Sequence, residues 1–174
     1  ADGKPLMPTR FARESLTPQL WLDLLPLIAA HWAELNPASD LPFNPDVQTY
    51  EDCDAGGILR IYTARREGRL VGYSAFIVRN GTHCRDVLQA THDGLFVERQ
   101  ARGITGAHFI IWCDEQLRAE GVRTVSQNSR LDHDIGPLLE RIGYVPQEMV
   151  YVRRLDQSSK LHDATYREPS GSLA

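Results

Sequence analysis

Apolar positions along the chain follow two periods, and the changes between them divide it into predicted helices and strands. Leucines and isoleucines recur at helical spacing between Thr17 and Asn36, after a Thr-Pro pair that is typical of an N-cap followed by proline in the first turn. Pro26 interrupts this run, so we expect it to kink the helix or to divide it in two. A second, short helix is predicted to begin at Asn44 and to end at the glycine pair 56–57.

The middle of the chain contains short runs rich in apolar and β-branched residues, which are typical of strands. Two such runs, at residues 58–64 and 70–78, flank an Arg-Glu-Gly-Arg turn and predict an antiparallel hairpin. The polar stretch 80–86 predicts a loop. Within it, Asn80-Gly81-Thr82 is interpreted as an Asn-Gly turn in preference to a glycosylation site.

A third strand is predicted over residues 87–97, followed by a glycine-rich turn and an amphipathic helix that ends at Gly121. Strict alternation places the side chains of this strand on two faces, with Thr91, Asp93, Leu95 and Val97 on one and His92, Gly94 and Phe96 on the other.

The last part of the chain predicts three further elements. A fourth strand is expected over residues 122–128. A helix follows, capped by Asp132 or Asp134 and ended by Gly143. A final strand or pair of strands is expected over residues 145–152, and the polar, aperiodic residues 156–174 predict a C-terminal tail.

Composition and charge narrow the classes of function. The chain has 174 residues, 42% of them hydrophobic and 24% charged, which is typical of one globular domain. Its formal net charge of -4 argues against a general nucleic-acid or anionic-membrane partner, and no apolar stretch is long enough to span a bilayer. Cys53, Cys84 and Cys113 are scattered and lack metal-site spacing, so we expect reduced thiols in a cytoplasmic protein without a metal.

The segment 97–107 carries the most informative order of residues, a strand followed by an Arg- and Gly-rich turn and a helix. Such a turn presents unpaired backbone N–H groups at the positive end of a helix dipole, which suits phosphate. Gly103 allows close approach to the backbone, and Arg99 and Arg102 add charged donors. The spacing fits neither a Walker loop nor a dinucleotide-binding fingerprint. A plain strand-to-helix turn is the alternative.

Two motifs give the chain a resemblance to a known family. Leu95-Phe96-Val97 followed by Arg102-Gly103-Ile104-Thr105-Gly106-Ala107 resembles the acyl-CoA pyrophosphate loop of GNAT acetyltransferases, Q/R-x-x-G-x-G/A, with Thr105 standing where that pattern has glycine or alanine. The run from Leu138 to Tyr144 is similar to a later helix signature of the family. The segments 88–91 and 133–139 look most like the corresponding residues of acetyltransferase-like proteins encoded in bacteriophage genomes.

This resemblance covers residues 58–155 and the leading helices. It implies an α/β fold of the α+β kind, with a mixed, mostly antiparallel central sheet that is flanked by helices and splayed near the Val97 strand. It also implies that residues 1–155 form a single acyltransferase domain, with 156–174 as a polar C-terminal tail.

The activity implied by the resemblance is transfer of an acetyl group from acetyl-CoA to a primary amine of a small molecule, peptide or protein. The amine would attack the thioester directly. Two alternatives stay open: a module that binds CoA without catalysis, and an interaction protein that leaves the loop empty. A homodimer is compatible with the sequence.

The resemblance assigns the cofactor to residues in and around the loop, namely Phe96, Val97, Arg99, Arg102, Gly103, Thr105, Gly106, Ala107 and Asn128. A backbone N–H near Val97 would stabilise the oxyanion that forms during transfer. For Asn128, a simple turn at the end of a strand is an equal alternative.

Three residues are candidates for moving protons. Asp93 is expected to act as the base through a water molecule, about 13 Å along the strand from Val97 on the same face, the alternative being a solvent-facing or backbone-bonded carboxylate. His133 is a histidine that precedes the later helix, and histidine is a common proton carrier; the alternative is that it belongs to the cap. Tyr144 follows that helix, where packing is the alternative role. Leu139 stands where the family commonly has the tyrosine that acts as general acid.

Overall fold

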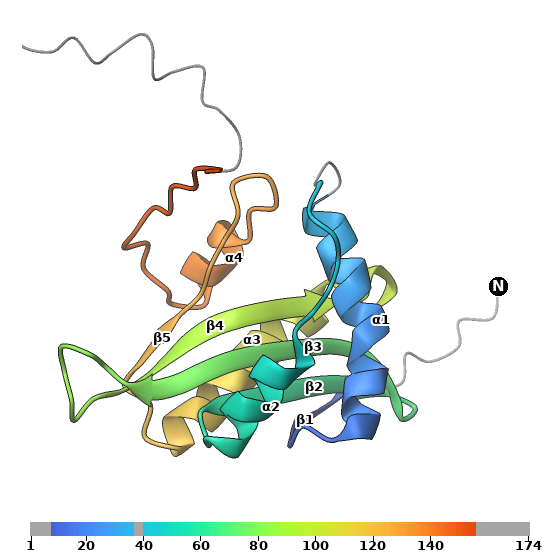
Figure 1. The fold of residues 1–174 in the computed structure, drawn as a ribbon, viewed down its shortest axis with the longest axis horizontal. Coiled ribbons are helices and arrows are strands. Elements are labelled where there is room, and N and C mark those ends of the chain that lie inside the picture. Colours follow the sequence, from blue (N-terminus) through green and yellow to red (C-terminus); the bar gives the residue numbers. More distant parts are fainter. Residues whose placement is uncertain (1–7, 37–39, 156–174) are drawn as a thin grey trace, which may run out of the picture. The chain divides into compact units, whose positions relative to one another are not determined.

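The computed structural model describes residues 8–36 and 40–155, and the predicted tail at 156–174 lies outside the described residues. Within residues 8–144 the chain forms a five-stranded sheet with helices on both faces (Figure 1). Residues from Val145 onward belong to a second unit, which is described by itself below. No described helix has both the length and the apolar character that crossing a membrane requires.

The sheet has the order β1-β2-β3-β4-β5, so strands that are consecutive in sequence lie side by side. Its strands are β1 (Arg10–Glu14), β2 (Leu59–Arg66), β3 (Arg69–Asn80), β4 (Leu88–Val97) and β5 (Thr124–Ser126). The first four pair antiparallel, whereas β5 runs parallel to β4. The predicted hairpin is confirmed as β2 and β3, which turn at Glu67 and Gly68 with positive φ at both residues. The sequence pattern does not predict β1.

Among the described residues the helices are α1 (Pro18–Leu35), α2 (Val47–Ala55), α3 (Ile104–Ala119) and α4 (Gly136–Arg141), with a 3-10 turn, η1 (Arg99–Ala101), before α3. Thr17 caps α1 as predicted, because its Oγ1 accepts a hydrogen bond from the N–H of Leu20 at 3.1 Å. α1 continues through Pro26 as one helix, so the predicted division does not occur. Leu20, Leu24 and Leu27 are buried along one side of α1, and their packing offsets the hydrogen bond that proline removes.

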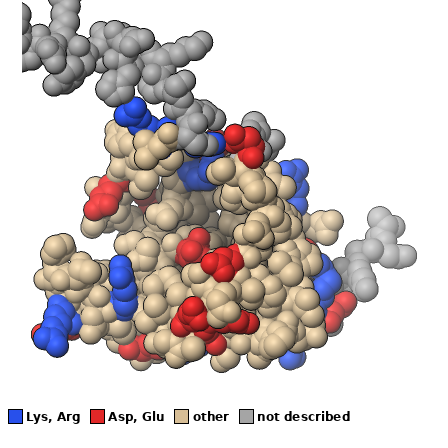
Figure 2. All heavy atoms as spheres, in the orientation of Figure 1, with Lys and Arg blue, Asp and Glu red and all other residues tan. Residues whose placement is uncertain are grey.

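α2 is a short acidic helix. It begins after Asp46, whose carboxylate accepts a hydrogen bond from the N–H of Thr49 at 3.2 Å, so the cap lies two residues beyond the predicted start. Its sequence includes Glu51, Asp52 and Asp54 and no lysine or arginine. Figure 2 shows the acidic side chains gathered over this helix.

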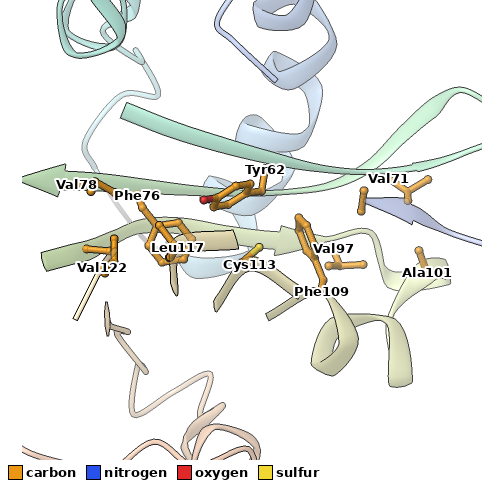
Figure 3. Close-up of a cluster of buried hydrophobic side chains, with 12 residues drawn as sticks. Tyr62, Val71, Phe76, Val78, Val97, Ala101, Phe109, Cys113, Leu117 and Val122 are labelled. Atoms are coloured by element: carbon orange, nitrogen blue, oxygen red, sulfur yellow. The ribbon is translucent and has the colours of Figure 1, made fainter. Parts of the chain in front are cut away.

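Two apolar clusters fill the spaces between the sheet and the helices. The α1-side cluster joins leucines of α1 to Tyr73 and Phe96 of the sheet. The α3-side cluster joins Phe109, Cys113 and Leu117 of α3 to the opposite face of the sheet (Figure 3). The sheet is therefore buried on both faces, with α1 and α2 covering one and α3 the other (Figure 1).

A β-bulge in β4 reverses the predicted alternation of its side chains. Ala75 of β3 pairs with Gly94, and the next residue of β3, Phe76, pairs with His92, so Asp93 is the extra residue. An extra residue shifts the phase of a strand by one position and exchanges its faces. The prediction that Asp93 shares a face with Val97 is therefore wrong.

Contacts on the two sides of the sheet confirm this change of phase. Ala90 and Val97 both belong to the α3-side cluster, although seven positions separate them and strict alternation would put them on opposite faces. Gly94 and Phe96 lie against α1 instead, where His31 is stacked on the Phe96 ring with 5.3 Å between ring centroids. Asp93 also lies on this side, because it accepts a hydrogen bond from Tyr50 of α2.

The predicted strand or strand pair at 145–152 is absent. The described residues 145–155 contain no helix and no strand, and their apolar side chains are exposed, as in Val150 at 79% and Tyr151 at 87%. Apolar alternation gives a strand only where one face packs and the backbone finds a partner. Two further boundaries also differ, since β5 is shorter than 122–128 and the residue that caps α4 is Ile135. Asp134 still contributes to the start of α4 by accepting a hydrogen bond from the N–H of Gly136 at 2.7 Å.

Candidate functional site

The sheet opens beside the second half of β4. β5 pairs with β4 only from Gln89 to Thr91, and no described strand pairs with that edge from His92 to Val97. The predicted splay near Val97 is therefore confirmed. The N–H of Glu98 donates to the carbonyl of Val71 in β3 at 2.8 Å. Because backbone groups of successive residues point to alternate sides, those of Leu95 and Val97 point away from β3, toward the open edge.

A glycine-lined turn continues from this edge into α3. Gly103 is the N-cap of α3, with φ of 86° and no capping side chain. A Cβ built at Gly103 or at Gly106 would meet nothing within 4 Å, so both residues border open space. The first N–H groups of a helix have no partner inside it and lie at the positive end of its dipole. The local geometry therefore fits an anionic group, as the sequence predicts.

Arg102, the second arginine of this turn, is hydrogen-bonded to both α1 and β4. The Nε of Arg102 donates to the carbonyl of Val97 at 2.8 Å, and its Nη2 donates to Oε2 of Glu34 at 2.7 Å. Its guanidinium also lies 5.4 Å from the centre of the Phe96 ring, which is a cation–π distance. Arg102 therefore bridges α1 to the open edge of β4. The contact pulls the pKa of Glu34 below its ordinary value, because Arg102 donates a hydrogen bond to the carboxylate.

Other residues of the loop are placed in different ways. Arg99 and Ala107 lie in the turn and in the first part of α3, with Arg99 exposed. Thr105 is buried, and its hydroxyl accepts a hydrogen bond from Nη2 of Arg66 at 3.1 Å. Its side chain is therefore engaged inside the protein, and only its backbone is available to an anion. Asn128 is exposed, two residues beyond the end of β5.

A group of polar side chains lies over the bulge of β4, and we call it the bulge group. It consists of Asp93, Tyr50, Tyr73 and His31. The hydroxyl of Tyr50 donates to Oδ2 of Asp93 at 2.6 Å. Burial, and then the hydrogen bond to Asp93, raises the pKa of Tyr50, so this phenol stays protonated.

Tyr73 and His31 form the second half of the bulge group. The Oη of Tyr73 and Nδ1 of His31 lie 2.7 Å apart, at hydrogen-bond distance. A Cβ built at Gly94 would lie 3.5 Å from this Oη and 3.9 Å from Cε1 of His31, so the pair sits directly over Gly94. Burial lowers the pKa of His31, against the charges of Glu34 and Asp93, which raise it.

Sequence reasoning did not select Tyr50, Tyr73 or His31. Tyr73 lies in an apolar strand and Tyr50 in an acidic helix, where a tyrosine carries no functional signal by itself. The available signal is His31, which interrupts the apolar stripe of α1. A histidine on the buried side of an amphipathic helix requires a polar partner, and Tyr73 is that partner.

Two sequence candidates lie elsewhere in the fold. Tyr144 donates from its hydroxyl to Oδ1 of Asp114 in α3 at 2.8 Å, and burial raises the pKa of both groups. His133 is exposed and joins the short bridge to Arg130 that precedes α4. Leu139 is buried at 6% exposure. The structure therefore brings Asp93, Phe96 and Arg102 together around α1, and it leaves Tyr144 against α3.

His92 and the cysteines provide no further chemistry at this place. His92 packs edge-on against Phe76, and burial lowers its pKa to about 4, so its imidazole is neutral. Cys53, Cys84 and Cys113 are free thiols. In the described part of the chain, no three His, Cys, Asp or Glu side chains are grouped in a way that could hold a metal ion.

Comparison with known proteins identifies the fold. No protein-family model and no curated protein sequence matches the chain. Among solved structures, an aminoglycoside acetyltransferase from an uncultured soil metagenomic sample, in complex with sisomicin, is similar at 15% identity and a TM-score of 0.66, over 84% of this chain and 95% of that one. Ribosomal-protein-alanine N-acetyltransferase from Brucella melitensis biovar Abortus 2308 is similar at 19% identity and a TM-score of 0.64, over 84% and 99% of the two chains.

A predicted acetyltransferase from Clostridium acetobutylicum, solved with acetyl-CoA, is similar at 10% identity and a TM-score of 0.63, over 87% of this chain and 100% of that one. These likenesses show that the chain has the fold of GNAT acetyltransferases, and they confirm the predicted α+β fold with its mixed sheet. At such low identity they show the fold alone. The narrower resemblance to phage-encoded proteins stays a prediction.

Proposed function

We propose that this protein transfers an acetyl group from acetyl-CoA to a primary amine. The observation that carries this proposal is the continuity between the open edge of β4 and the glycine-lined start of α3. An extended arm with amide groups can pair with the backbone of Leu95 and with the N–H of Val97, whose carbonyl accepts from Arg102. A diphosphate at the end of that arm then meets the N–H groups that follow Gly103.

Specific residues would hold acetyl-CoA in this arrangement. The backbone N–H groups of Gly103, Ile104 and Thr105 would bind the diphosphate, because that of Gly106 already donates to the carbonyl of Gly103. Arg99 would add charge from the preceding turn. The side chain of Arg102 covers the carbonyl of Val97 and is paired with Glu34. When the cofactor binds along this edge, Arg102 would break its contact with Glu34 or contact Glu34 and the diphosphate together. When bound, acetyl-CoA supplies a thioester that an amine can attack, and an N–H of the open edge near Val97 would stabilise the oxyanion.

The amine must lose a proton during transfer, and the bulge group is the place that supports this step. Its Asp93, exposed on the α1 side, is the base that the sequence suggests. Tyr144 is less suited to reach a substrate, since its hydroxyl is held by Asp114 on α3. His133 remains the other candidate from the sequence, since it is exposed and lies near enough to Glu34 to lower the pKa of that carboxyl.

The acceptor is proposed to be an amine of a small molecule, a peptide or a protein, and to approach from the face of α1 and α2. Acidic side chains gather over α2 on this face (Figure 2). A cationic amine would be attracted there. The structural neighbours include enzymes named for an aminoglycoside and for a ribosomal-protein alanine, which are both amine acceptors.

One observation favours a second function. Leu139 is buried where related enzymes commonly place a tyrosine acid, so the protein would then bind CoA without rapid transfer. CoA thiolate is a tolerable leaving group, so the transfer does not require a dedicated general acid.

Two measurements test these functions in order. Acetyl-CoA should raise the unfolding temperature of the protein, whereas adenosine at equal concentration should not. Release of free thiol should then be followed with acetyl-CoA and a panel consisting of sisomicin, spermidine and a peptide with N-terminal alanine. Stabilisation with thiol release supports the transferase, and stabilisation without release from any amine supports the binding module. No stabilisation by acetyl-CoA would refute both.

A further inference from the structure

We propose that Tyr73 and His31 form a proton relay that accepts the proton of the attacking amine, with Asp93 and Glu34 supplying negative charge around it. This assignment rests on the proposed acetyl transfer and names the groups that carry out one of its steps. Neither residue belongs to the motif of the loop or to the helix signature that the resemblance rests on.

The position of the pair over the sheet is the first argument. Tyr73 lies opposite Phe96 in the register of β3 and β4, and its ring stands over Gly94. Gly94 directly precedes Leu95, whose backbone groups face the open edge. A thioester held along that edge would therefore lie next to the Tyr73 hydroxyl. Glycine at 94 leaves room for this approach, because a Cβ there would come within 3.3 Å of Cε2 of Tyr73 and press against its ring.

The hydrogen bond between the two residues is the second argument. With 2.7 Å between Oη and Nδ1, Tyr73 donates its proton to His31 when the imidazole carries its own proton on Nε2. The Oη then keeps a lone pair that can accept a proton from an amine. Tyr73 is 7% exposed, so water competes little for this lone pair.

Charges around His31 are the third argument. Glu34 of α1 and Asp93 of β4 raise its pKa, whereas burial and the charge of Arg102 lower it, and burial is the largest effect. The imidazole is therefore neutral at pH 7 and free to accept a proton. Once it is protonated, Asp93 and Glu34 stabilise the positive charge. Burial and the charge of Asp93 raise the pKa of Tyr73, which keeps this phenol protonated before the step.

The proposed step conserves atoms and charge. The amine nitrogen forms a bond to the acyl carbon, and its proton moves to Oη of Tyr73. The original Tyr73 proton moves at the same time to Nδ1 of His31, which becomes an imidazolium. The bond between the acyl carbon and sulfur then breaks, and the thiolate takes a proton from solvent. His31 returns its proton to solvent through Nε2 or back through Tyr73 before the next cycle.

Asp93 differs from this pair in its surroundings. It is exposed, and one of its oxygens is already hydrogen-bonded to Tyr50. Tyr73, in contrast, is only 7% exposed. Proton transfer from a neutral amine to its hydroxyl therefore meets less competition from water than transfer to Asp93. Asp93 is therefore assigned a positioning and charge-stabilising part.

The test compares two variants with two matched controls. Tyr73→Phe removes the accepting hydroxyl, and Tyr62→Phe removes a buried hydroxyl on the other face of the sheet, where the Tyr62 oxygen has no partner among the described residues. His31→Gln removes the imidazole, and His83→Gln removes an exposed one in the loop between β3 and β4. Circular dichroism and the Kd for acetyl-CoA, measured by calorimetry, check folding and cofactor binding in each.

The expected result is a loss of about 10²-fold or more in kcat for Tyr73→Phe and His31→Gln. The Kd for acetyl-CoA should remain unchanged, and both controls should match the wild type. The assay uses acetyl-CoA and the panel amine that gives the fastest thiol release. When the rate is expressed per concentration of neutral amine, kcat/KM of the wild type should still fall on the acid side with a midpoint below 6.5, and this remaining fall should vanish in His31→Gln.

A second readout does not depend on activity. The imidazole of His31, followed by NMR in the free protein, should titrate below 6.5, and its pKa and chemical shifts should change in Tyr73→Phe but not in Tyr62→Phe. The relay would be overturned, and the proposed function left intact, if the wild type transfers acetyl groups and both Tyr73→Phe and His31→Gln have the same kcat and the same acid limb as the wild type. A wild type that binds acetyl-CoA and releases no thiol would overturn the transferase, and the relay with it.

Discussion

The hydroxyl of Tyr50 donates a 2.6 Å hydrogen bond to Oδ2 of Asp93, which joins α2 to the bulged residue of β4. The two residues are 43 positions apart in the sequence. One oxygen of the carboxylate is held by this bond. This contact makes Asp93 a residue of defined orientation in spite of its exposure.

Replacing Asp93 distinguishes two roles for this residue, one as the base and one as a negative charge that stabilises protonated His31. Asp93→Asn keeps an oxygen that can accept from Tyr50 and removes the negative charge. If the charge only stabilises protonated His31, we expect kcat to fall by about tenfold, which is less than in Tyr73→Phe. Tyr50→Phe should change kcat less, since the carboxylate remains. A loss in Asp93→Asn as large as that in Tyr73→Phe would instead make Asp93 the base.

Gly103→Glu should prevent the binding of acetyl-CoA. The new carboxylate would stand among the N–H groups at the start of α3 and repel a diphosphate. The φ of 86° adds strain of about 1–2 kcal/mol for any residue with a Cβ. Gly121→Glu is the matched control, because Gly121 has φ of 89° and open space at the other end of α3. Loss of stabilisation by acetyl-CoA in both variants alike would contradict the placement of the cofactor at this turn.

Tyr62→Phe should stabilise the protein. The hydroxyl of Tyr62 is buried in the α3-side cluster with no hydrogen-bond partner among the described residues (Figure 3). Removing an unsatisfied buried group recovers about 1 kcal/mol or more. For a chain of 174 residues this raises the unfolding temperature by about 2–4 °C. Calorimetric unfolding of both proteins checks the sign, and a lower unfolding temperature in the variant would show that the hydroxyl is satisfied in solution.

His92 should make the protein less stable in mild acid. Burial lowers its pKa from 6.5 to about 4 in the folded state, so the unfolded chain binds more protons between these values. Stability is fully present above pH 6.5 and falls as pH drops toward 4, by about 3 kcal/mol at most. Urea unfolding of His92→Leu should show a smaller fall over this range than the wild type. Parallel curves for the two proteins would contradict the lowered pKa.

The local order of residues made much of the fold predictable. Thr17 with Pro18, and the polar turn between residues 66 and 69, each define an element within a few positions, and the structure has both. β1 is short and mixes arginine and glutamate with one phenylalanine, so its pattern carries little signal. Residues 145–152 have a strand-like pattern and lack strand structure, because a pattern does not supply the pairing partner.

The two parts of the candidate site, the turn at Gly103 and the bulge group, also differ in how far the sequence predicts them. The turn at Gly103 is contiguous in the chain, so its strand, turn and helix could be recognised in order. The bulge group comes from four separate elements, and His31 and Tyr73 are 42 positions apart. No spacing rule joins such residues. The wrong face of Asp93 has a third cause, since a single extra residue is invisible to a period of two.

The bulge also constrains how the length of this chain can vary. Deleting Asp93 would restore strict alternation and leave Ala90 and Phe96 on their present faces, but it would remove the carboxylate that Tyr50 contacts. Deleting or inserting one residue elsewhere in β4 would instead turn one part of the strand away from the cluster in which it is packed. Insertions at residues 81–87, before β4 begins, would disturb neither side. Homologues that keep this fold should therefore differ in length at that loop, and within β4 only at the position of the bulge.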